Sequence, residues 1–403
     1  MSLLPTIGLI YHTLRHELAS RLARTWRSAA RRERPLRIGV DIRPFYEPLT
    51  GVGWYLYYLL HELAKHDVEL YLFGDARITD LGPRLHAGLP ANAKVCTFDL
   101  RGRPLGRFDR PLTAAAYVAW MELTACDVYL AANYFLPRLH SAVARRRVIT
   151  IHDLTYKRFP ELLQKETLAN LESQMAREIA AADAIVCVSE STRRDLLHYY
   201  DVDPGRAVAI HSGLGRPATA EPVDGLPPRY LLFVSTIEPR KDLETLLDAY
   251  ERLRDAGTYE GALVVVGKIG WKSESLVPRL RRPGVVHLDY LRAEQLATVY
   301  ERAEAFVFPS IYEGFGFPLL EAMARGVPSI AAQSSSLPEI GGDAALYFPP
   351  RDVNALMTQI GRVVSDAALR QELAARGRAR AAEFGWERAA AETLAVLRRA
   401  AAP

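Results

Sequence analysis

The sequence predicts an α/β protein of two doubly wound domains that face a cleft, and three observations lead to this prediction. From Pro35 onward, short aliphatic and β-branched runs alternate with longer helical segments, which is typical of parallel sheets covered by helices on both faces. The alternation stops in a stretch rich in Gly and Pro, residues 212–228, and then begins again. A chain of 403 residues, 49% of them hydrophobic, can bury two such cores.

The individual elements follow the same alternation in both halves. In the first half the expected strands are Leu36–Ile42, Val68–Gly74, Asp127–Ala131, Arg147–Ile151, Ala184–Val188 and Ala207–Ile210. In the second half they are Tyr230–Ser235, Gly261–Gly267, Val285–Leu288, Ala305–Phe308 and Pro328–Ala332, with helical stretches such as Asp242–Arg254 and Ala293–Ala303.

These patterns set the domain boundaries. We expect an N-terminal Rossmann-like domain at residues 35–215, a linker at 216–228, a C-terminal Rossmann-like domain at 229–385 and a C-terminal helix at 386–403. The sequence leaves open on which domain the last helix, around Glu387–Arg399, packs.

Residues 1–34 differ from the rest of the chain. Apolar residues recur at steps of three and four, and arginines supply charge with almost no acids opposite them, which predicts an amphipathic basic helix. A secretory signal would carry its charge before the apolar stretch, and no apolar run reaches spanning length. Two interpretations remain: the helix lies on an anionic membrane surface, or it packs against the body or a partner.

Composition excludes several classes of function. The net charge of +4, from 51 basic and 47 acidic residues, is too balanced for a nucleic-acid binder that relies on its field. The three cysteines, Cys96, Cys126 and Cys187, lie far apart and lack metal-ligand spacing, which fits a reducing cytoplasm. Any site for an anion must therefore be local.

The strongest candidate anion site follows the first strand of the second half. Pro239 and Asp242 predict a turn and the start of a helix, which places Arg240 and Lys241 at its positive end, beside the carboxyl end of the strand. An arginine can hold two phosphate oxygens and a lysine adds a point charge, so the pair suits a diphosphate. The alternative is a solvated basic pair in a loop.

A second element combines two glutamates with a glycine-rich loop. Gly314 and Gly316 let the backbone approach a ligand, and Pro318 suits the first turn of a helix that Gly326 ends. Glu313 precedes this helix and Glu321 lies about one turn inside it, so their carboxylates can accept hydrogen bonds from sugar and ribose hydroxyls. The candidate ligand-binding segment is Gly314, Phe315, Gly316, Phe317 and Glu321.

The first domain offers weaker candidates. Gly51, Val52 and Gly53 open the helix after the first strand, where a phosphate or an acceptor approaches the backbone, although a tight turn explains them equally well. His152 follows the strand Arg147–Ile151 with an acid beside it, which favours a catalytic role over a structural one.

Asp201-Val202-Asp203 matches the acid pair by which other sugar transferases bind a metal ion. Pro204 follows directly, and Asp and Pro serve turns for local reasons, so we expect a turn here. No metal ion or other cofactor is then needed, because Arg240 and Lys241 supply the positive charge.

The chain from residue 36 onward resembles the retaining glycosyltransferases of family four, which have the GT-B architecture, and among them bacterial mannosyltransferases of polysaccharide assembly. The resemblance is carried by the Glu-x7-Glu element at 313–321, by Arg240 and Lys241, and by Val266-Gly267-Lys268-Ile269-Gly270-Trp271. Similar proteins often carry Arg after the second glycine of the 51–53 turn, where this chain has Trp54.

The resemblance implies a role for each candidate. Arg240 and Lys241 would bind the donor diphosphate, Glu321 the nucleotide ribose and Glu313 the donor sugar, while His152 would lie beside the reacting carbon. The donor would be a nucleotide-diphosphate sugar, with GDP-mannose favoured, and the acceptor a glycan or a lipid-linked glycan at the inner face of the cell membrane. The N-terminal domain would then lie on the acceptor side and the C-terminal domain would bind the nucleotide sugar.

Two hypotheses from different classes remain at this point. The first is a metal-independent retaining hexosyltransferase of polysaccharide biosynthesis. The second is a non-catalytic sugar-nucleotide-binding or scaffold subunit, which the fold would permit. The joint presence of both glutamates, His152 and the basic pair favours the first, because a scaffold does not need them together.

Overall fold

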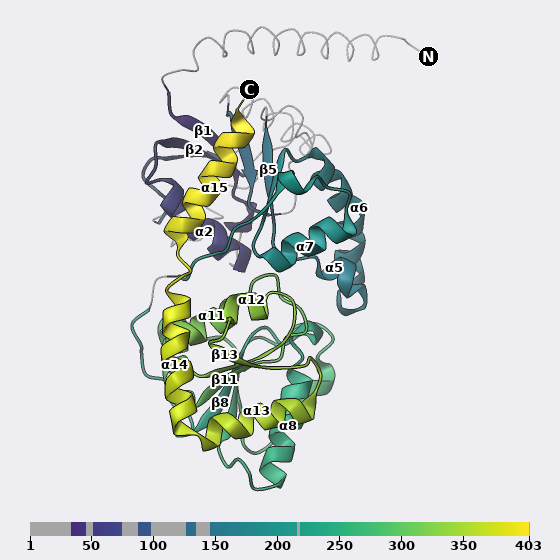
Figure 1. The fold of residues 1–403 in the computed structure, drawn as a ribbon, viewed down its shortest axis with the longest axis vertical. Helices are drawn as coiled ribbons and strands as arrows, with labels where there is room; N and C mark the ends of the chain where they lie inside the picture. Colours follow the sequence, from purple (N-terminus) through teal and green to yellow (C-terminus); the bar gives the residue numbers. More distant parts are fainter. Residues whose placement is uncertain are drawn as a thin grey trace, which may run out of the picture.

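The fold is that of a computed structural model, which describes residues 34–45, 51–74, 88–97, 126–133, 146–215 and 218–402. Two α/β lobes lie one above the other in Figure 1, joined by segments that cross between them. The predicted leader helix falls outside the described residues except for Arg34.

The N-terminal lobe contains a seven-stranded sheet in the order β3-β2-β1-β4-β5-β6-β7, and every neighbouring pair is parallel. Strand order therefore reverses between β1 and β4, the place where doubly wound sheets open a crevice at their carboxyl edge. The strands are β1 (Leu36–Asp41), β2 (Val68–Gly74), β3 (Ala93–Thr97), β4 (Val128–Ala131), β5 (Arg147–Ile151), β6 (Ala184–Cys187) and β7 (Ala207–Ala209).

The C-terminal lobe repeats this plan with six parallel strands in the order β10-β9-β8-β11-β12-β13. Its reversal lies between β8 and β11, so loops from these two strands meet at one edge. The strands are β8 (Tyr230–Val234), β9 (Ala262–Val266), β10 (Val285–Leu288), β11 (Ala305–Phe308), β12 (Ser329–Ala332) and β13 (Ala345–Phe348).

Helices cover both sheets. Those of the first lobe are α2 (Gly51–Leu63), α5 (Thr155–Arg158), α6 (Lys165–Ala181) and α7 (Glu190–Tyr199). Those that follow are α8 (Leu243–Asp255), α9 (Val277–Leu280), α10 (Ala293–Glu301), α11 (Phe317–Ala324), α12 (Leu337–Gly341), α13 (Val353–Ser365), α14 (Ala367–Ala381) and α15 (Trp386–Ala401). Among the described residues, no helix is long and apolar enough to cross a bilayer.

The two-sheet prediction is confirmed, and each strand that the sequence predicts is present to within one residue at either end. Two strands were not predicted, β3 and β13, and both lie at the edges of their sheets. The sequence of β3, AKVCT, mixes polar with apolar residues, and β13 is four residues long with two of them half-buried. β3 therefore lacks the continuous apolar run of a central parallel strand, whereas β13, with the sequence ALYF, is a short apolar run at a sheet edge.

The structure shows on which lobe the last helix packs, a point that the sequence left open. Figure 1 shows α14 running along the C-terminal lobe and α15 lying on the N-terminal lobe beside α2. The ring of Trp386 contacts those of Tyr55 and Tyr58 from α2, with centroids 5.5 and 5.6 Å apart. A Cβ on Gly213 would lie 2.3 Å from the backbone nitrogen of Trp386, so the two crossing segments touch.

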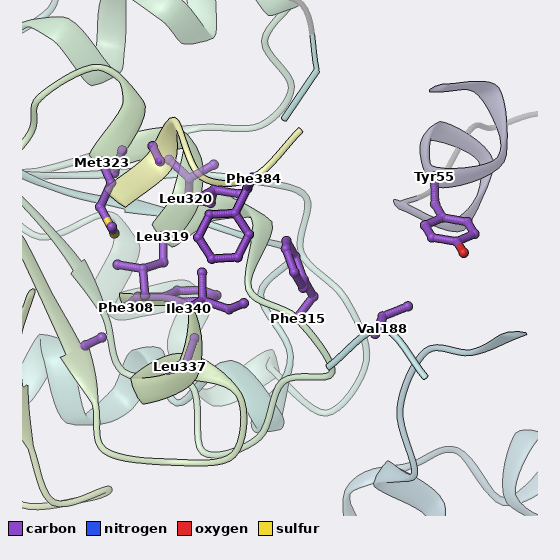
Figure 2. Close-up of a cluster of buried hydrophobic side chains, with 14 of the residues drawn as sticks. Tyr55, Val188, Phe308, Phe315, Leu319, Leu320, Met323, Leu337, Ile340 and Phe384 are labelled. Atoms are coloured by element: carbon purple, nitrogen blue, oxygen red, sulfur yellow. The ribbon is translucent and has the colours of Figure 1, made fainter. Parts of the chain in front are cut away.

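An apolar cluster continues from the C-terminal core to the interface between the lobes. Figure 2 shows Phe315 and Phe384 on the side of this core that faces Val188 and Tyr55 of the N-terminal lobe. Phe315 is 4% exposed, and its ring centroid lies 6.0 Å from that of Phe384. The interface therefore has an apolar centre behind the cleft.

Candidate functional site

A compact ion cluster lies where the carboxyl ends of β8 and β11 meet. Lys241 Nζ lies 2.5 Å from Glu313 Oε1, and Arg240 Nη1 lies 3.0 Å from Glu313 Oε2. The other end of the guanidinium binds Glu238 Oε1 at 2.8 Å. Two cations and two carboxylates are thus held together at the predicted edge of the sheet, although Glu313 lies 73 and 72 positions from Arg240 and Lys241 in the chain.

The route of the backbone to these cations differs from the sequence prediction. Arg240 and Lys241 do not occupy the start of α8 but a separate 3-10 turn, η7 (Pro239–Lys241). Asp242 follows in the left-handed region with φ of 50°, and α8 begins only at Leu243. The 3-10 turn and the ion pairs with Glu313 therefore position the two cations, and the start of α8 does not.

The charged groups of the cluster shift one another's pKa values. Burial alone favours the neutral form of Glu313, but Lys241 and Arg240 outweigh it and lower the pKa of this carboxyl to about 2. Burial and the neighbouring guanidinium lower the pKa of Lys241, while burial raises the pKa of Glu238. Glu313 is thus the ionised centre of the cluster.

Serines after β12 hold the Glu313 loop in place. The Ser335 hydroxyl accepts a hydrogen bond from the Glu313 backbone nitrogen at 2.7 Å. Ser336 donates to the Glu313 and Phe315 carbonyls at 3.0 and 2.8 Å and is fully buried. Sequence reasoning missed both residues, although the run Ser334-Ser335-Ser336 at a strand's carboxyl end was a readable signal.

The glycines of this loop serve packing first. A Cβ on Gly314 would lie 1.7 Å from the backbone oxygen of His152, so the loop presses directly on the N-terminal lobe. Gly316 has φ of 109°, and a Cβ there would meet Leu337 at 2.8 Å. The absence of a side chain at Gly314 allows the loop to approach the N-terminal lobe closely, which brings Glu313 next to His152.

His152 lies at the carboxyl end of β5, as predicted. Its Nε2 lies 2.8 Å from the Ala132 carbonyl oxygen, which can only accept, so Nε2 carries the proton. Burial lowers the pKa of His152, and Tyr55 packs edge-on against the ring with centroids 5.0 Å apart. His152 is therefore a neutral imidazole held in one orientation at the end of β5.

The other predicted residues of the C-terminal lobe lie in α11 or directly before it. Phe317 begins α11, with Pro318 in its first turn and Gly326 just past its end, as expected. Glu321 accepts a hydrogen bond from the Tyr300 hydroxyl at 3.1 Å, and burial raises its pKa. The ring of Phe315 is buried in the apolar interface between the lobes.

The glycine-containing turn starts α2, as predicted. Gly51 begins the helix and has nothing within 4 Å of an added Cβ, while Gly53 is buried. Trp54 is 46% exposed and stacks on Tyr58 with centroids 6.0 Å apart. The open space at Gly51 supports a plain turn as much as a ligand contact.

Polar bridges join the lobes on either side of the cluster. The Tyr312 hydroxyl donates to Asp195 Oδ2 at 2.6 Å and accepts from the Leu154 nitrogen at 3.2 Å. Glu339 of α12 accepts from the Glu190 and Ser191 backbone nitrogens at the start of α7, at 2.7 and 2.9 Å. The Trp271 indole donates to the Leu162 carbonyl at 2.8 Å.

The acid pair at 201–203 forms the predicted turn. Asp203 accepts from the Gly205 nitrogen at 2.9 Å and precedes a 3-10 turn, Pro204–Arg206. Within the ranges that the structure describes, no three Asp, Glu, His or Cys side chains gather as metal ligands.

Comparison with known proteins places this geometry in a family. "Glycosyltransferase Family 4" matches residues 49–214, and "Glycosyl transferases group 1" matches residues 221–380. The chain is 32% identical over 384 residues to O-antigen chain mannosyltransferase B of Escherichia coli, covering 89% of this chain and 98% of that protein.

Solved structures show the same fold. Sucrose-phosphate synthase from Thermosynechococcus elongatus matches with a TM-score of 0.70 at 22% identity, over 90% of this chain and 98% of that one. Anabaena HepE in complex with UDP and glucose matches with a TM-score of 0.68 at 18% identity, over 90% of this chain and 100% of that one. Two family matches that cover both lobes and a full-length relative show that the chain belongs to glycosyltransferase family four and is a retaining, metal-independent hexosyltransferase of the GT-B architecture.

Proposed function

We propose that this enzyme transfers mannose from GDP-mannose to a glycan or lipid-linked acceptor during polysaccharide assembly. The support for mannose is the relative named an O-antigen chain mannosyltransferase, which matches over nearly its whole length. The reaction breaks the bond between the anomeric carbon and a diphosphate, so the main barrier is the charge that develops on the leaving group.

The ion cluster at the β8–β11 edge is the observation that carries the assignment. Arg240 and Lys241 bind the donor diphosphate, and they already face one carboxylate in a buried, low-dielectric site. A diphosphate competes with Glu313 for these cations, which frees that carboxylate to accept hydrogen bonds from sugar hydroxyls. Arg240 and Lys241 thus have an anionic partner both before and after the donor binds, which keeps them in position.

The remaining candidates take roles around this center. Glu321, held by Tyr300, accepts from the ribose hydroxyls, and backbone groups of residues 314–317 line the donor. His152 borders the reacting carbon as a neutral ring with a fixed tautomer. Glu313 is tied to two cations and is a weak nucleophile, which supports assistance of the incoming hydroxyl by the departing phosphate.

The test is a panel of nucleotide sugars with the purified enzyme. GDP-mannose is expected to be hydrolysed fastest and to raise the melting temperature most, because a ligand that binds only the folded state stabilises it. Faster turnover of a UDP-sugar would replace mannose and guanosine in the proposal. No turnover of any nucleotide sugar, with or without glycan acceptors, would refute the assignment of donor roles.

We also propose that residues 1–34 bind an anionic membrane surface and hold the enzyme at the inner face of the cell membrane. The arginine-rich amphipathic pattern of this segment supports the proposal. A chain lacking residues 1–33 should lose sedimentation with phosphatidylglycerol vesicles and keep donor hydrolysis. Sedimentation equal to that of the full chain would instead favour a helix that packs on protein.

A further inference from the structure

Tyr312 belongs to the C-terminal lobe, but its ring packs against residues of the N-terminal lobe. It stands in the loop between β11 and α11, directly before Glu313. Its ring centroid lies 5.9 Å from that of Phe159, and the guanidinium carbon of Arg158 lies 5.9 Å from the same ring. The residue is 1% exposed. The loop that carries Glu313 is therefore held from the side of the N-terminal lobe.

The Tyr312 hydroxyl binds a buried carboxylate of α7. It donates to Asp195 Oδ2 at 2.6 Å and accepts from the Leu154 backbone nitrogen at 3.2 Å. Asp195 is 8% exposed, and its Oδ1 lies 3.4 Å from Nη1 of Arg158, whose side chain is 49% exposed. An ion pair with so exposed a partner contributes little, so the short hydrogen bond from Tyr312 is the strong contact of this carboxylate. Burial and the nearby carboxylates raise the pKa of Tyr312, which therefore stays protonated and donates.

The backbone of the same tyrosine holds Arg240. The Tyr312 carbonyl oxygen accepts from Arg240 Nη1 at 2.8 Å and from the Ser310 hydroxyl at 3.2 Å. The next residue is Glu313, whose Oε2 lies 3.0 Å from the same Nη1. Two acceptors of Arg240 thus lie on consecutive residues, and the side chain of the first is held by the N-terminal lobe.

A guanidinium that stabilises a leaving group must be placed accurately. Arg240 can be reached by a ligand, because its side chain is 18% exposed and it lines a cavity of about 380 Å³ between the lobes. Displacing a catalytic group by about 1 Å can lower a rate on the order of 10²-fold. The loss is greatest in the transition state, where the leaving diphosphate gains charge, so a displaced Arg240 lowers kcat and leaves the KM nearly unchanged.

Packing alone does not explain a carboxylate at position 195. A buried carboxylate costs free energy unless it is well paired, so an apolar residue would fill the same space at lower cost. The carboxylate of Asp195 provides a charge-assisted hydrogen bond, which is shorter and about twice as strong as a neutral one. Such a bond holds the Tyr312 hydroxyl, and with it the Tyr312 carbonyl, more firmly in place.

We propose that Asp195 is a positioning residue of the donor site, which acts through Tyr312 to fix the guanidinium of Arg240. The proposal rests on the proposed role of Arg240 at the donor diphosphate. Asp195 belongs to α7 of the N-terminal lobe and affects the reaction only through this chain of contacts. A residue of one lobe thereby determines how accurately the ion cluster of the other lobe is aligned.

Three variants test this chain of contacts, with the nucleotide sugar that the wild type turns over fastest. Asp195→Ala and Tyr312→Phe should each lower kcat about ten- to a hundredfold and change the donor KM less than about twofold. Asp195→Asn keeps an acceptor oxygen in a side chain of the same size, so its kcat should stay within about threefold of the wild type. A merely structural contact would lower the melting temperature without this split between kcat and KM. An unchanged kcat in Asp195→Ala would overturn the proposal.

Tyr259→Phe is the matched control. The Tyr259 hydroxyl also donates to a carboxylate, Glu304 Oε2, at 3.2 Å, and the residue is 2% exposed. Both residues precede strands of the C-terminal sheet, β9 and β11, so they lie at the edge opposite the ion cluster. Tyr259→Phe should lower the melting temperature and leave kcat within about twofold of the wild type. A fall in kcat equal to that of Tyr312→Phe would assign the effect to general destabilisation and overturn the proposal.

A double-mutant cycle tests whether Asp195 acts through Arg240. Arg240→Lys keeps the positive charge but cannot hold the Tyr312 carbonyl and two carboxylates at once. In the Arg240→Lys background, Asp195→Ala should lower kcat by less than about a further twofold, whereas a fall as large as in the wild-type background would overturn the proposal.

The same cycle separates this proposal from the proposed function. If the wild type turns over no nucleotide sugar, or if Arg240→Lys turns over as fast as the wild type, the proposed function fails. Urea unfolding of the four proteins of the cycle then decides the coupling. The losses in unfolding free energy from Asp195→Ala and Arg240→Lys should not add, because both residues belong to one hydrogen-bond network. Losses that simply add would overturn the coupling between Asp195 and Arg240.

Discussion

The carboxyl edges of the two sheets differ in how their polar groups are satisfied. On the C-terminal edge, Arg240, Lys241 and Glu313 bind one another, and serines after β12 hold the loop that carries Glu313. On the N-terminal edge, Thr155 has an unpaired hydroxyl beside an open cavity. The comparison indicates that the charged groups of the C-terminal edge are assembled before any substrate arrives, and we call this edge the preassembled edge.

The most severe test of the preassembled edge removes its lysine. Lys241→Ala takes away one cation of the proposed donor site and one partner of Glu313, so we expect donor turnover to fall about 10²- to 10³-fold, as when one transition-state charge contact is lost. Glu313→Gln should lower turnover at least tenfold. Initial rates with saturating GDP-mannose measure both effects, and circular dichroism checks that each variant is folded. Turnover like that of the wild type in both variants would remove the cluster from the site.

Acid titration measures how much the ion pairs of Glu313 stabilise the fold. The pKa of Glu313 is lowered from the usual 4.5 to about 2, so its ionised form contributes stability above pH 4.5, and this contribution is lost as pH falls from 4.5 towards 2. A shift of this size corresponds to about 3 kcal/mol. The difference in unfolding free energy between wild type and Glu313→Gln should therefore be greatest near pH 6 and shrink towards pH 2. Urea titrations at stepped pH would show it, and a constant difference would contradict the ion-pair account.

These contrasts also explain how far the sequence could predict the molecule. The central strands were visible because parallel strands buried on both faces are continuous apolar runs, and Arg240 and Glu313 were visible because they follow such strands. The edge strand β3 lacks such a run, and β13 is an apolar run of only four residues, two of them half-buried.

What the sequence did not predict depends on contacts between distant segments. The pairing of Glu313 with Lys241, the packing of Gly314 on His152 and the return of α15 to the first lobe each join residues more than seventy positions apart. The buried ring of Phe315 belongs to the same class, because its burial depends on the facing lobe. Local pattern carries no information on such pairings.

A bridge between the lobes offers an intermediate test. Glu339→Gln removes the charge that accepts from two backbone nitrogens of α7 and lies 2.5 Å from His211 Nε2. Hydrogen bonds to a charged acceptor stabilise a fold more than hydrogen bonds to a neutral one, so we expect the unfolding free energy to fall by about 1–2 kcal/mol. Turnover should fall less than it does in Lys241→Ala. Glu372→Gln, in an exposed pair with Arg376, is the control and should cost less than about 0.5 kcal/mol. Equal losses would show that the bridge does not couple the lobes.

The smallest effect is expected at the acid pair of residues 201–203, away from both edges. Asp203 is exposed, and its carboxylate caps a 3-10 turn through the Gly205 nitrogen, so Asp203→Ala should lower stability by about 0.5–1 kcal/mol. Donor turnover should stay within twofold of the wild type, with or without added Mn²⁺, because in the proposed function Arg240 and Lys241 supply the positive charge at the diphosphate. A variant that loses turnover and regains it with Mn²⁺ would make this pair a metal site. In that case a metal ion, and not the preassembled edge, would neutralise the charge of the leaving group.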